Sequence, residues 1–206
     1  MRPAPLALLA ALALPGTALG ATREVRLELG SIAAPDPDWN LFSDADRLST
    51  QGLGVGWTFH DHLALVAGWR RGAHGMTVGG ESTGQSDLTA TFGGHLFSLG
   101  AKADWTIAPW FAPFATARAA GLLGIVRLDD EPDDDENLNQ ITHAAFAPGA
   151  LATAGAEFRL PFHDGAFAAA TSLELGYAWL APLSYDPLGD LAFRGFTLTW
   201  GAGVRF

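Results

Sequence analysis

Apolar and polar residues alternate at every second position in many parts of this chain. In the stretch 196–206, "FTLTWGAGVRF", the apolar series F, L, W, A, V, F is interleaved with T, T, G, G, R. A period of two is typical of a β-strand with one apolar and one polar face. Similar alternation predicts seven further strands, at 24–29, 53–60, 63–70, 98–105, 114–128, 152–160 and 172–179. The phase is least clear in the alanine-rich stretch 114–128, where we place Arg118 on the polar face.

The connections between these stretches alternate between long and short. Long connections lie at 33–52, 71–94, 129–143 and 181–193, and short ones at 60–62, 107–110 and 161–165. This pattern is typical of up-and-down hairpins whose two ends face different compartments. The sequence therefore predicts an all-β fold, an eight-stranded antiparallel up-and-down transmembrane β-barrel.

The distribution of aromatic and charged residues indicates which face points outward. Aromatic residues on the apolar face cluster near the ends of the predicted strands, as in the interfacial girdles of membrane barrels: Trp57, Phe59, Trp69, Trp105, Tyr177 and Trp179. The polar faces carry six basic and five acidic residues, a nearly neutral set that suits a closed lumen. This predicted lumen charge network consists of Glu24, Arg26, Glu28, Arg70, Lys102, Asp104, Arg118, Glu157, Arg159, Glu174 and Arg205. The alternative orientation, with the apolar face inside, would give a secreted soluble barrel of the lipocalin type.

The first twenty residues, "MRPAPLALLAALALPGTALG", have the features of a secretory signal peptide. Arg2 provides a positive start, an apolar core follows, and 18–20 forms a small-residue cleavage site. An uncleaved membrane helix is the alternative, but the run is short and is interrupted by Pro15 and Gly16. We expect a signal peptide at 1–20, export, and a barrel at 21–206.

Composition excludes several classes of protein. The chain has no cysteine, which argues against a disulfide-stabilised scaffold and an amino-terminal lipid anchor. Arg2 is the only charged residue in 1–20, so its removal takes the formal net charge from −10 to −11. Such an acidic chain is poorly suited to nucleic acid, and we expect no nucleic-acid partner.

Taken together, these patterns resemble the small eight-stranded outer-membrane β-barrel proteins of Gram-negative bacteria, over residues 22–206. The most specific element is the stretch 196–206, with Phe206 in last position. In that family such a strand resembles the signal read by the barrel-assembly machinery. The resemblance implies recognition positions at Leu198, Trp200, Val204 and Phe206. Phe206 also fits a plain role as a lipid-facing aromatic residue.

Motifs for chemistry are weak. The six histidines form no metal pair at helical spacing, and we expect those at 74, 95 and 143 in or beside loops. Some barrels of this kind modify lipid A, but no convincing Ser/His pair lies on the lipid-facing positions. We therefore predict no enzyme and no cofactor. Seven carboxylates in 129–136 are a weak candidate for a cation site: Asp129, Asp130, Asp133, Asp134, Asp135 and Glu136, with Glu131.

The predicted size of the barrel limits its function. An eight-stranded barrel has an interior that side chains can fill, so the long loops are expected to carry the function. We predict a monomeric integral outer-membrane protein with a structural or surface-interaction role, in contact with outer-membrane lipid and lipopolysaccharide. The alternative is a narrow channel for small solutes. A lipid A-modifying enzyme and a secreted carrier are less favoured.

Overall fold

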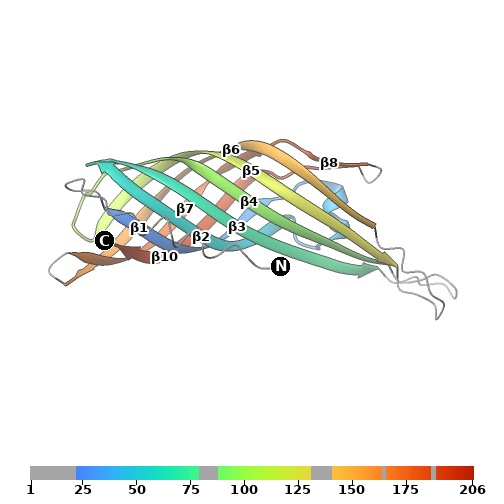
Figure 1. The fold of residues 1–206 in the computed structure, drawn as a ribbon, viewed down its shortest axis with the longest axis horizontal. Coiled ribbons are helices and arrows are strands. Elements are labelled where there is room, and N and C mark those ends of the chain that lie inside the picture. Colours follow the sequence, from blue (N-terminus) through green and yellow to red (C-terminus); the bar gives the residue numbers. More distant parts are fainter. Residues whose placement is uncertain (1–21, 79–87, 131–140, 164–165, 187–188) are drawn as a thin grey trace.

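The computed structural model describes residues 22–78, 88–130, 141–163, 166–186 and 189–206. Eight strands close into a barrel in which each strand pairs antiparallel with its neighbour in the chain (Figure 1). The barrel strands are β1 (Arg23–Ala33), β2 (Arg47–His60), β3 (Leu63–Val78), β4 (Leu88–Asp104), β5 (Phe111–Asp130), β6 (Ile141–Phe162), β7 (Phe167–Leu180) and β10 (Arg194–Arg205). The predicted signal peptide at 1–20 lies outside the described residues. No helix in the described ranges is long and apolar enough to span a bilayer.

The barrel is closed by the pairing of its first and last strands. β1 and β10 run antiparallel from Glu24 opposite Arg205 to Ile32 opposite Thr197. The Arg23 amide donates to the Phe206 carbonyl at 2.7 Å, and the Phe206 amide donates back at 2.9 Å. A strand within hydrocarbon cannot leave these backbone groups unpaired, so closure removes the only open edges that an up-and-down sheet would have.

The outer face of the barrel carries large apolar side chains. Leu175 is 61% exposed and Phe196 is 81% exposed, whereas Glu174, the residue before Leu175, is 2% exposed. The same contrast between neighbouring positions recurs on β1, where Leu27 is exposed and Glu28 is buried. Charges inside and leucines outside are the arrangement of a barrel surrounded by lipid. This orientation is the reverse of a lipocalin-type barrel.

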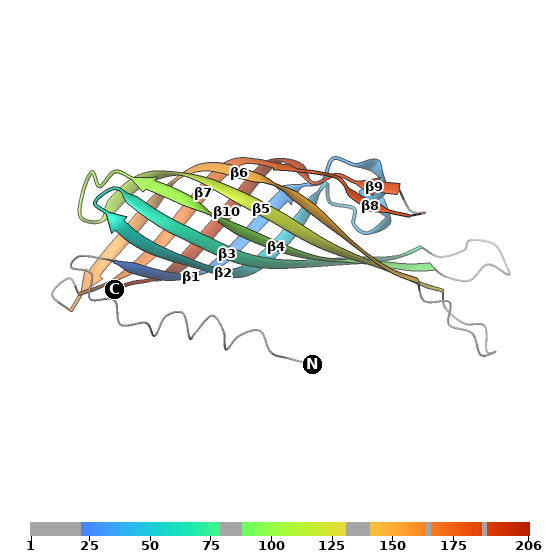
Figure 2. The same cartoon turned by 45° about the horizontal axis from the view of Figure 1, so that its top comes forward.

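Most of the barrel strands are longer than the alternation predicts, and four of them lengthen one end of the barrel. β3 continues to Val78 and β4 begins at Leu88, so most of the connection expected at 71–94 is strand; β6 begins at Ile141 instead of 152. Arg23 and Phe206, the paired ends of the described chain, lie together at one end of the barrel, and we call them the termini. The four neighbours β3, β4, β5 and β6 extend past the rest of the barrel at the opposite end (Figures 1 and 2). We call this part the β-extension: residues 72–78, 88–94, 124–130 and 141–148.

The prediction that His74 and His95 occupy or border loops was therefore wrong, because both lie inside strands, whereas His143 lies two residues from the start of β6. The apolar/polar contrast fades in the β-extension for a physical reason. Several of its outward positions are polar, including Thr77, Thr89 and Thr91, as suits a surface that has left the lipid, whereas Phe146 is apolar and exposed. Where fewer outward positions are apolar, the period-two pattern loses its strongest signal.

The connections at the long-loop end fold over the interior of the barrel. Residues 34–46 include a short 3-10 helix, η1 (Pro37–Leu41), and residues 181–193 contain a two-stranded hairpin formed by β8 (Leu183–Tyr185) and β9 (Gly189–Leu191). The Asp36 carboxylate joins the two segments, because it accepts from the Asp38 amide at 3.1 Å and from the Ala192 amide at 3.2 Å. These segments meet inward-facing strand residues in an apolar cluster.

A charged residue on the outer face should be strongly destabilising. Leu175 and Leu198 are directly opposite each other on β7 and β10. Leu175→Arg should lower the free energy of unfolding by about 2–4 kcal/mol, because the outward side chain meets hydrocarbon. Reversible urea unfolding of the barrel in lipid vesicles measures this, with Leu175→Met as the apolar control. Equal stability of the arginine variant and the control would show that this face does not meet lipid.

Candidate functional site

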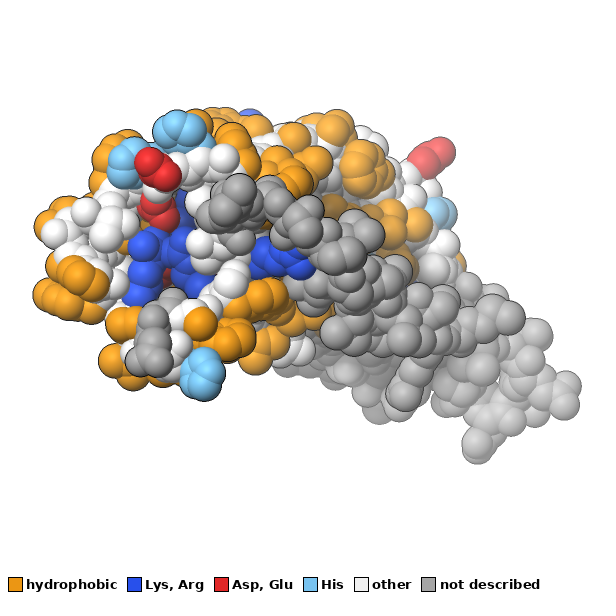
Figure 3. All heavy atoms as spheres, turned by 60° about the vertical axis from the view of Figure 1, so that its left-hand side comes forward, with side chains coloured by type: hydrophobic (Ala, Val, Ile, Leu, Met, Phe, Trp, Pro, Cys, Tyr) orange, Lys and Arg blue, Asp and Glu red, His pale blue; other side chains and the backbone are white. Residues whose placement is uncertain are grey.

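The half of the interior nearest the chain termini contains eleven charged side chains. We call them the lumen network; they are the residues that the sequence placed on the polar faces. They come from seven of the eight barrel strands: Glu24, Arg26 and Glu28 on β1, Arg70 on β3, Lys102 and Asp104 on β4, Arg118 on β5, Glu157 and Arg159 on β6, Glu174 on β7, and Arg205 on β10. Figure 3 looks toward the termini and shows basic and acidic side chains gathered within a rim of hydrophobic ones.

Strand β2 makes room for this network. Beside the network, its inward positions 52, 54 and 56 are all glycines. A Cβ atom on Gly54 would lie 2.3 Å from Glu28 Oε1 and 2.9 Å from Arg26 Nε. A side chain at that position would therefore displace the ion pair of Arg26 and Glu28.

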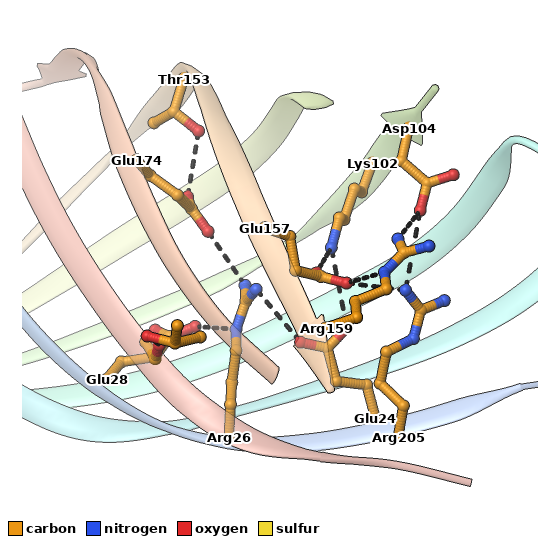
Figure 4. Close-up of polar contacts among 12 residues, drawn as sticks. Glu24, Arg26, Glu28, Lys102, Asp104, Thr153, Glu157, Arg159, Glu174 and Arg205 are labelled. Atoms are coloured by element: carbon orange, nitrogen blue, oxygen red, sulfur yellow. Dashed lines mark hydrogen bonds and ion pairs between the residues drawn. The ribbon is translucent and has the colours of Figure 1, made fainter. Parts of the chain in front are cut away.

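One part of the network is built around the Glu157 carboxylate, which is 0% exposed. Glu157 accepts from Lys102 Nζ at 2.5 Å, from Arg159 Nε at 2.6 Å and from Arg205 Nη1 at 2.7 Å. Arg159 also pairs with Asp104 at 2.7 Å, and Arg205 approaches the same carboxylate at 3.9 Å. Figure 4 shows these side chains converging from β4, β6 and β10. Three cations therefore share one fully buried carboxylate.

The second part is built around Arg26. Its guanidinium contacts Glu28 Oε1 at 2.8 Å, Glu174 Oε1 at 3.2 Å and Glu24 Oε1 at 3.4 Å (Figure 4). Arg118 binds the other Glu174 oxygen at 2.8 Å, and the Thr153 hydroxyl donates to that oxygen at 3.1 Å. Glu24 links the two parts, because its second oxygen lies 3.7 Å from Lys102 Nζ.

Arg70 is held at the margin of the second part. Its Nη1 donates to the Thr199 hydroxyl at 2.6 Å, and its Nε lies 4.0 Å from Glu28 Oε2. Each of the five carboxylates and six cations of the network thus has an opposite charge within 4.0 Å. Breaking one pair would leave its partner charged and buried, which is strongly unfavourable. This arrangement favours a rigid, filled lumen.

The other half of the interior is apolar. We call it the apolar plug, and its inward strand residues include Ile32, Leu48, Phe92, Leu122 and Val126, with Trp39, Phe42, Leu183, Tyr185, Leu191 and Phe193 from the covering segments. The Trp39 ring lies at its centre, edge-to-face with Phe92 and with Phe193 at centroid distances of 5.2 Å. Its Nε1 donates to the Ala45 carbonyl at 2.6 Å, so the polar edge of the indole is satisfied.

Tyr185 is the exception within the plug. Its hydroxyl has no hydrogen-bond partner among the described residues, and burial raises its pKa. The ring fits there because β5 has a glycine opposite it: a Cβ atom on Gly124 would lie 2.2 Å from the Tyr185 hydroxyl oxygen.

The sequence analysis did not predict this plug. From the alternation, 33–52 and 181–193 are expected only as long connections. The available indication was the presence of Trp39, Phe42, Tyr185 and Phe193 within stretches otherwise rich in aspartate and proline. Large apolar side chains in a polar connection indicate that the connection packs against a core.

The remaining predicted site residues lie elsewhere. Leu198, Trp200, Val204 and Phe206 are on the exposed face of β10, and the Phe206 ring contacts the Phe167 ring at a centroid distance of 6.4 Å. Of the acidic candidates for a cation site, Asp129 and Asp130 end β5, while Asp133, Asp134, Asp135 and Glu136 lie outside the described residues. Within the described ranges, no group of three or more His, Asp or Glu side chains is arranged to hold a metal ion.

An apolar outer face, a charged and neutralised lumen and complete strand closure define a transmembrane β-barrel. No protein-family model and no curated protein matches the chain. Solved structures with a similar fold include Ail, the attachment invasion locus protein of Yersinia pestis, with 12% identity over 90% of this chain and 97% of that chain and a TM-score of 0.49. The amino-terminal barrel domain of Pseudomonas aeruginosa OprF shows 16% identity over 89% and 97% of the two chains, with a TM-score of 0.40. Neisserial surface protein A shows 10% identity over 90% and 96%, with a TM-score of 0.42. Likeness at this level concerns the fold alone.

Removing the shared carboxylate should destabilise the barrel. Glu157→Gln leaves Lys102, Arg159 and Arg205 facing one another, so the free energy of unfolding should fall by about 3–5 kcal/mol. Urea unfolding in vesicles measures the change. Glu24→Gln is the matched control, because the ion pairs of Glu24 are longer, at 3.4 and 3.7 Å. This variant should lose less unfolding free energy than Glu157→Gln. A second change, Lys102→Met, should recover part of the stability lost in Glu157→Gln. An equal effect of the two Gln substitutions would contradict the central role of Glu157.

Proposed function

We propose that the protein is an integral barrel of the Gram-negative outer membrane, with a structural or surface-interaction role. The observation that carries this proposal is the contrast between the two faces of its strands. Leucines and aromatic residues are exposed outside, and paired charges are buried inside. Such a chain would be insoluble without lipid or detergent, because its largest surface is apolar.

The β-extension supports the surface role. Strands β3 to β6 extend beyond the membrane-facing part of the barrel, at the end away from the termini (Figure 2). Their outward residues include Thr77, Thr89, Thr91 and Arg127, and the Thr77 and Thr89 hydroxyls are 3.0 Å apart. A sheet that projects from a membrane barrel and presents polar side chains among its outward residues is suited to contacts with other molecules at the cell surface.

A channel is less favoured. In the half nearest the termini the lumen is occupied by ion-paired side chains, and in the other half by the apolar plug, whose Trp39 is 0% exposed. A solute would have to displace both. We therefore propose the surface role and not conduction.

Biogenesis follows from the same proposal. We infer that residues 1–20 direct export, that Leu198, Trp200, Val204 and Phe206 are recognised by the barrel-assembly machinery, and that the folded barrel is a monomer in contact with lipid and lipopolysaccharide. The outward position of all four side chains on β10 supports this inference, because it leaves them accessible to a partner before closure.

Surface labelling tests the topology. Because the chain lacks cysteine, Thr77→Cys and Asp61→Cys can be compared without background. We expect a membrane-impermeant maleimide to label Thr77→Cys on intact cells, because position 77 lies in the β-extension. Asp61→Cys, in the short turn between β2 and β3, should react only after the outer membrane is permeabilised. The reverse order of labelling would show that the barrel is inserted the other way round.

Removal of Phe206 should impair both assembly and closure. The deletion loses two backbone hydrogen bonds to Arg23 and the aromatic side chain, whereas Phe206→Ala loses the side chain alone. If the side chain acts as an assembly signal, both variants should accumulate as periplasmic aggregate, with less heat-modifiable barrel on gels. Wild-type levels of folded barrel for Phe206→Ala would remove the signal role of the side chain.

A further inference from the structure

The outer face of the barrel has a polar interruption in its apolar surface. Gln51 on β2 is directly opposite Arg71 on β3, and Arg71 is directly opposite His95 on β4. All three residues occupy outward positions, next to the inward and buried Arg70 and Leu96. We call Gln51, Arg71 and His95 the outward triad. The triad presents a guanidinium, an amide and an imidazole side by side on three neighbouring strands.

Two adjoining grooves meet at Gln51 and Arg71 of this triad. The apolar groove lies toward the termini and is lined by Leu27, Leu29, Leu53, Trp69 and Trp200. The polar groove continues toward the long-loop end and is lined by Ser49, Thr50, Gln51, Arg71, Gly72 and Ala73. Leu29, Gln51 and Arg71 belong to both. The Trp69 ring is stacked on the His95 ring with an interplanar angle of 16°, so the imidazole is held beside the apolar groove.

Arg71 differs from the arginines inside the barrel. It forms no ion pair with any described residue, whereas its neighbour Arg70 pairs with Glu28. An outward guanidinium at the edge of an apolar surface is unfavourable in lipid unless an anion meets it. Within the described residues no such anion pairs with Arg71, and an anion from the surroundings would meet this need.

The position of Arg71 indicates which lipid supplies the anion. It lies in the second half of β3, on the side of the long connections and away from the termini and the short turns. In the proposed orientation this level corresponds to the outer leaflet. An anionic lipid there would place its headgroup at the polar groove and an acyl chain along the apolar one.

We propose that the two grooves bind one molecule of a phosphorylated glycolipid, the lipid A part of lipopolysaccharide. Arg71 binds a phosphate group through two parallel hydrogen bonds, with Gln51 and His95 as further donors. An acyl chain lies along Leu27, Leu53 and Trp200. This inference rests on the proposed outer-membrane location and specifies which lipid the barrel holds and where.

Native mass spectrometry of the detergent-purified, folded barrel tests the site. Diphosphoryl lipid A, dephosphorylated lipid A and inorganic phosphate are the three probes. We expect one diphosphoryl lipid A to bind tightly, the dephosphorylated form to bind much more weakly, and inorganic phosphate not to displace the bound lipid. Arg71→Gln should weaken binding of diphosphoryl lipid A by about tenfold or more, and Arg71→Lys should weaken it less.

Arg127→Gln is the matched control, because it removes an outward arginine of the β-extension that lines neither groove. It should bind lipid A like the wild type. Heat-modifiability on gels shows that each variant is folded. Equal binding by Arg71→Gln and the wild type, or equal binding of both lipid forms, would overturn the proposal, and displacement by inorganic phosphate would reassign the site to free phosphate. This assay uses purified protein, so it can fail while surface labelling still places the barrel in the outer membrane.

Discussion

Backbone hydrogen bonding in a medium without water is the constraint on which this structure depends. Every strand must pair on both sides, and seven of the eight pairings are between barrel strands that follow one another along the chain. The eighth joins β1 to β10, the most distant strands in the sequence. Closure by this pairing brings Arg26 and Arg205 into the same lumen as Glu157 and Glu174, so the ring and the ion-pair network form together.

The interior combines two ways of filling space. In the half nearest the termini, long charged side chains fill the lumen, and glycines on β2 leave the room that those side chains need. In the other half, inward strand residues are apolar, and the connections fold over them to form the plug. A charged side chain placed in the plug would lack an opposite charge to pair with. An apolar residue placed in the lumen network would leave a buried charge without its partner. The division therefore keeps each kind of side chain among its own partners.

The outer surface has the reverse distribution of apolar and polar side chains. It must be apolar where lipid surrounds it, and it becomes polar where β3 to β6 emerge from the lipid. The outward triad lies between the apolar and the polar part of this surface, at the level where a lipid headgroup meets its acyl chains. A phosphate there would satisfy Arg71 in the way that the carboxylates satisfy the arginines of the lumen, which makes charge pairing a requirement on both sides of the barrel wall.

The sequence by itself determined the strand number, the identity of the two faces and the membership of the lumen network. Strand number and network membership follow from period-two alternation, which is local and needs no knowledge of distant contacts, and the outward direction of the apolar face follows from where aromatic and charged residues lie along the strands. Tertiary structure decided which charges pair, because the partners of Glu157 come from β4, β6 and β10. It also decided the extension of β3 to β6, since the apolar outer face that marks a strand in the sequence weakens where strands leave the lipid. It decided the burial of Trp39 as well, since a tryptophan in a loop gives no indication of what will cover it. Local pattern specifies which way a side chain points, and only the closed barrel specifies what that side chain meets.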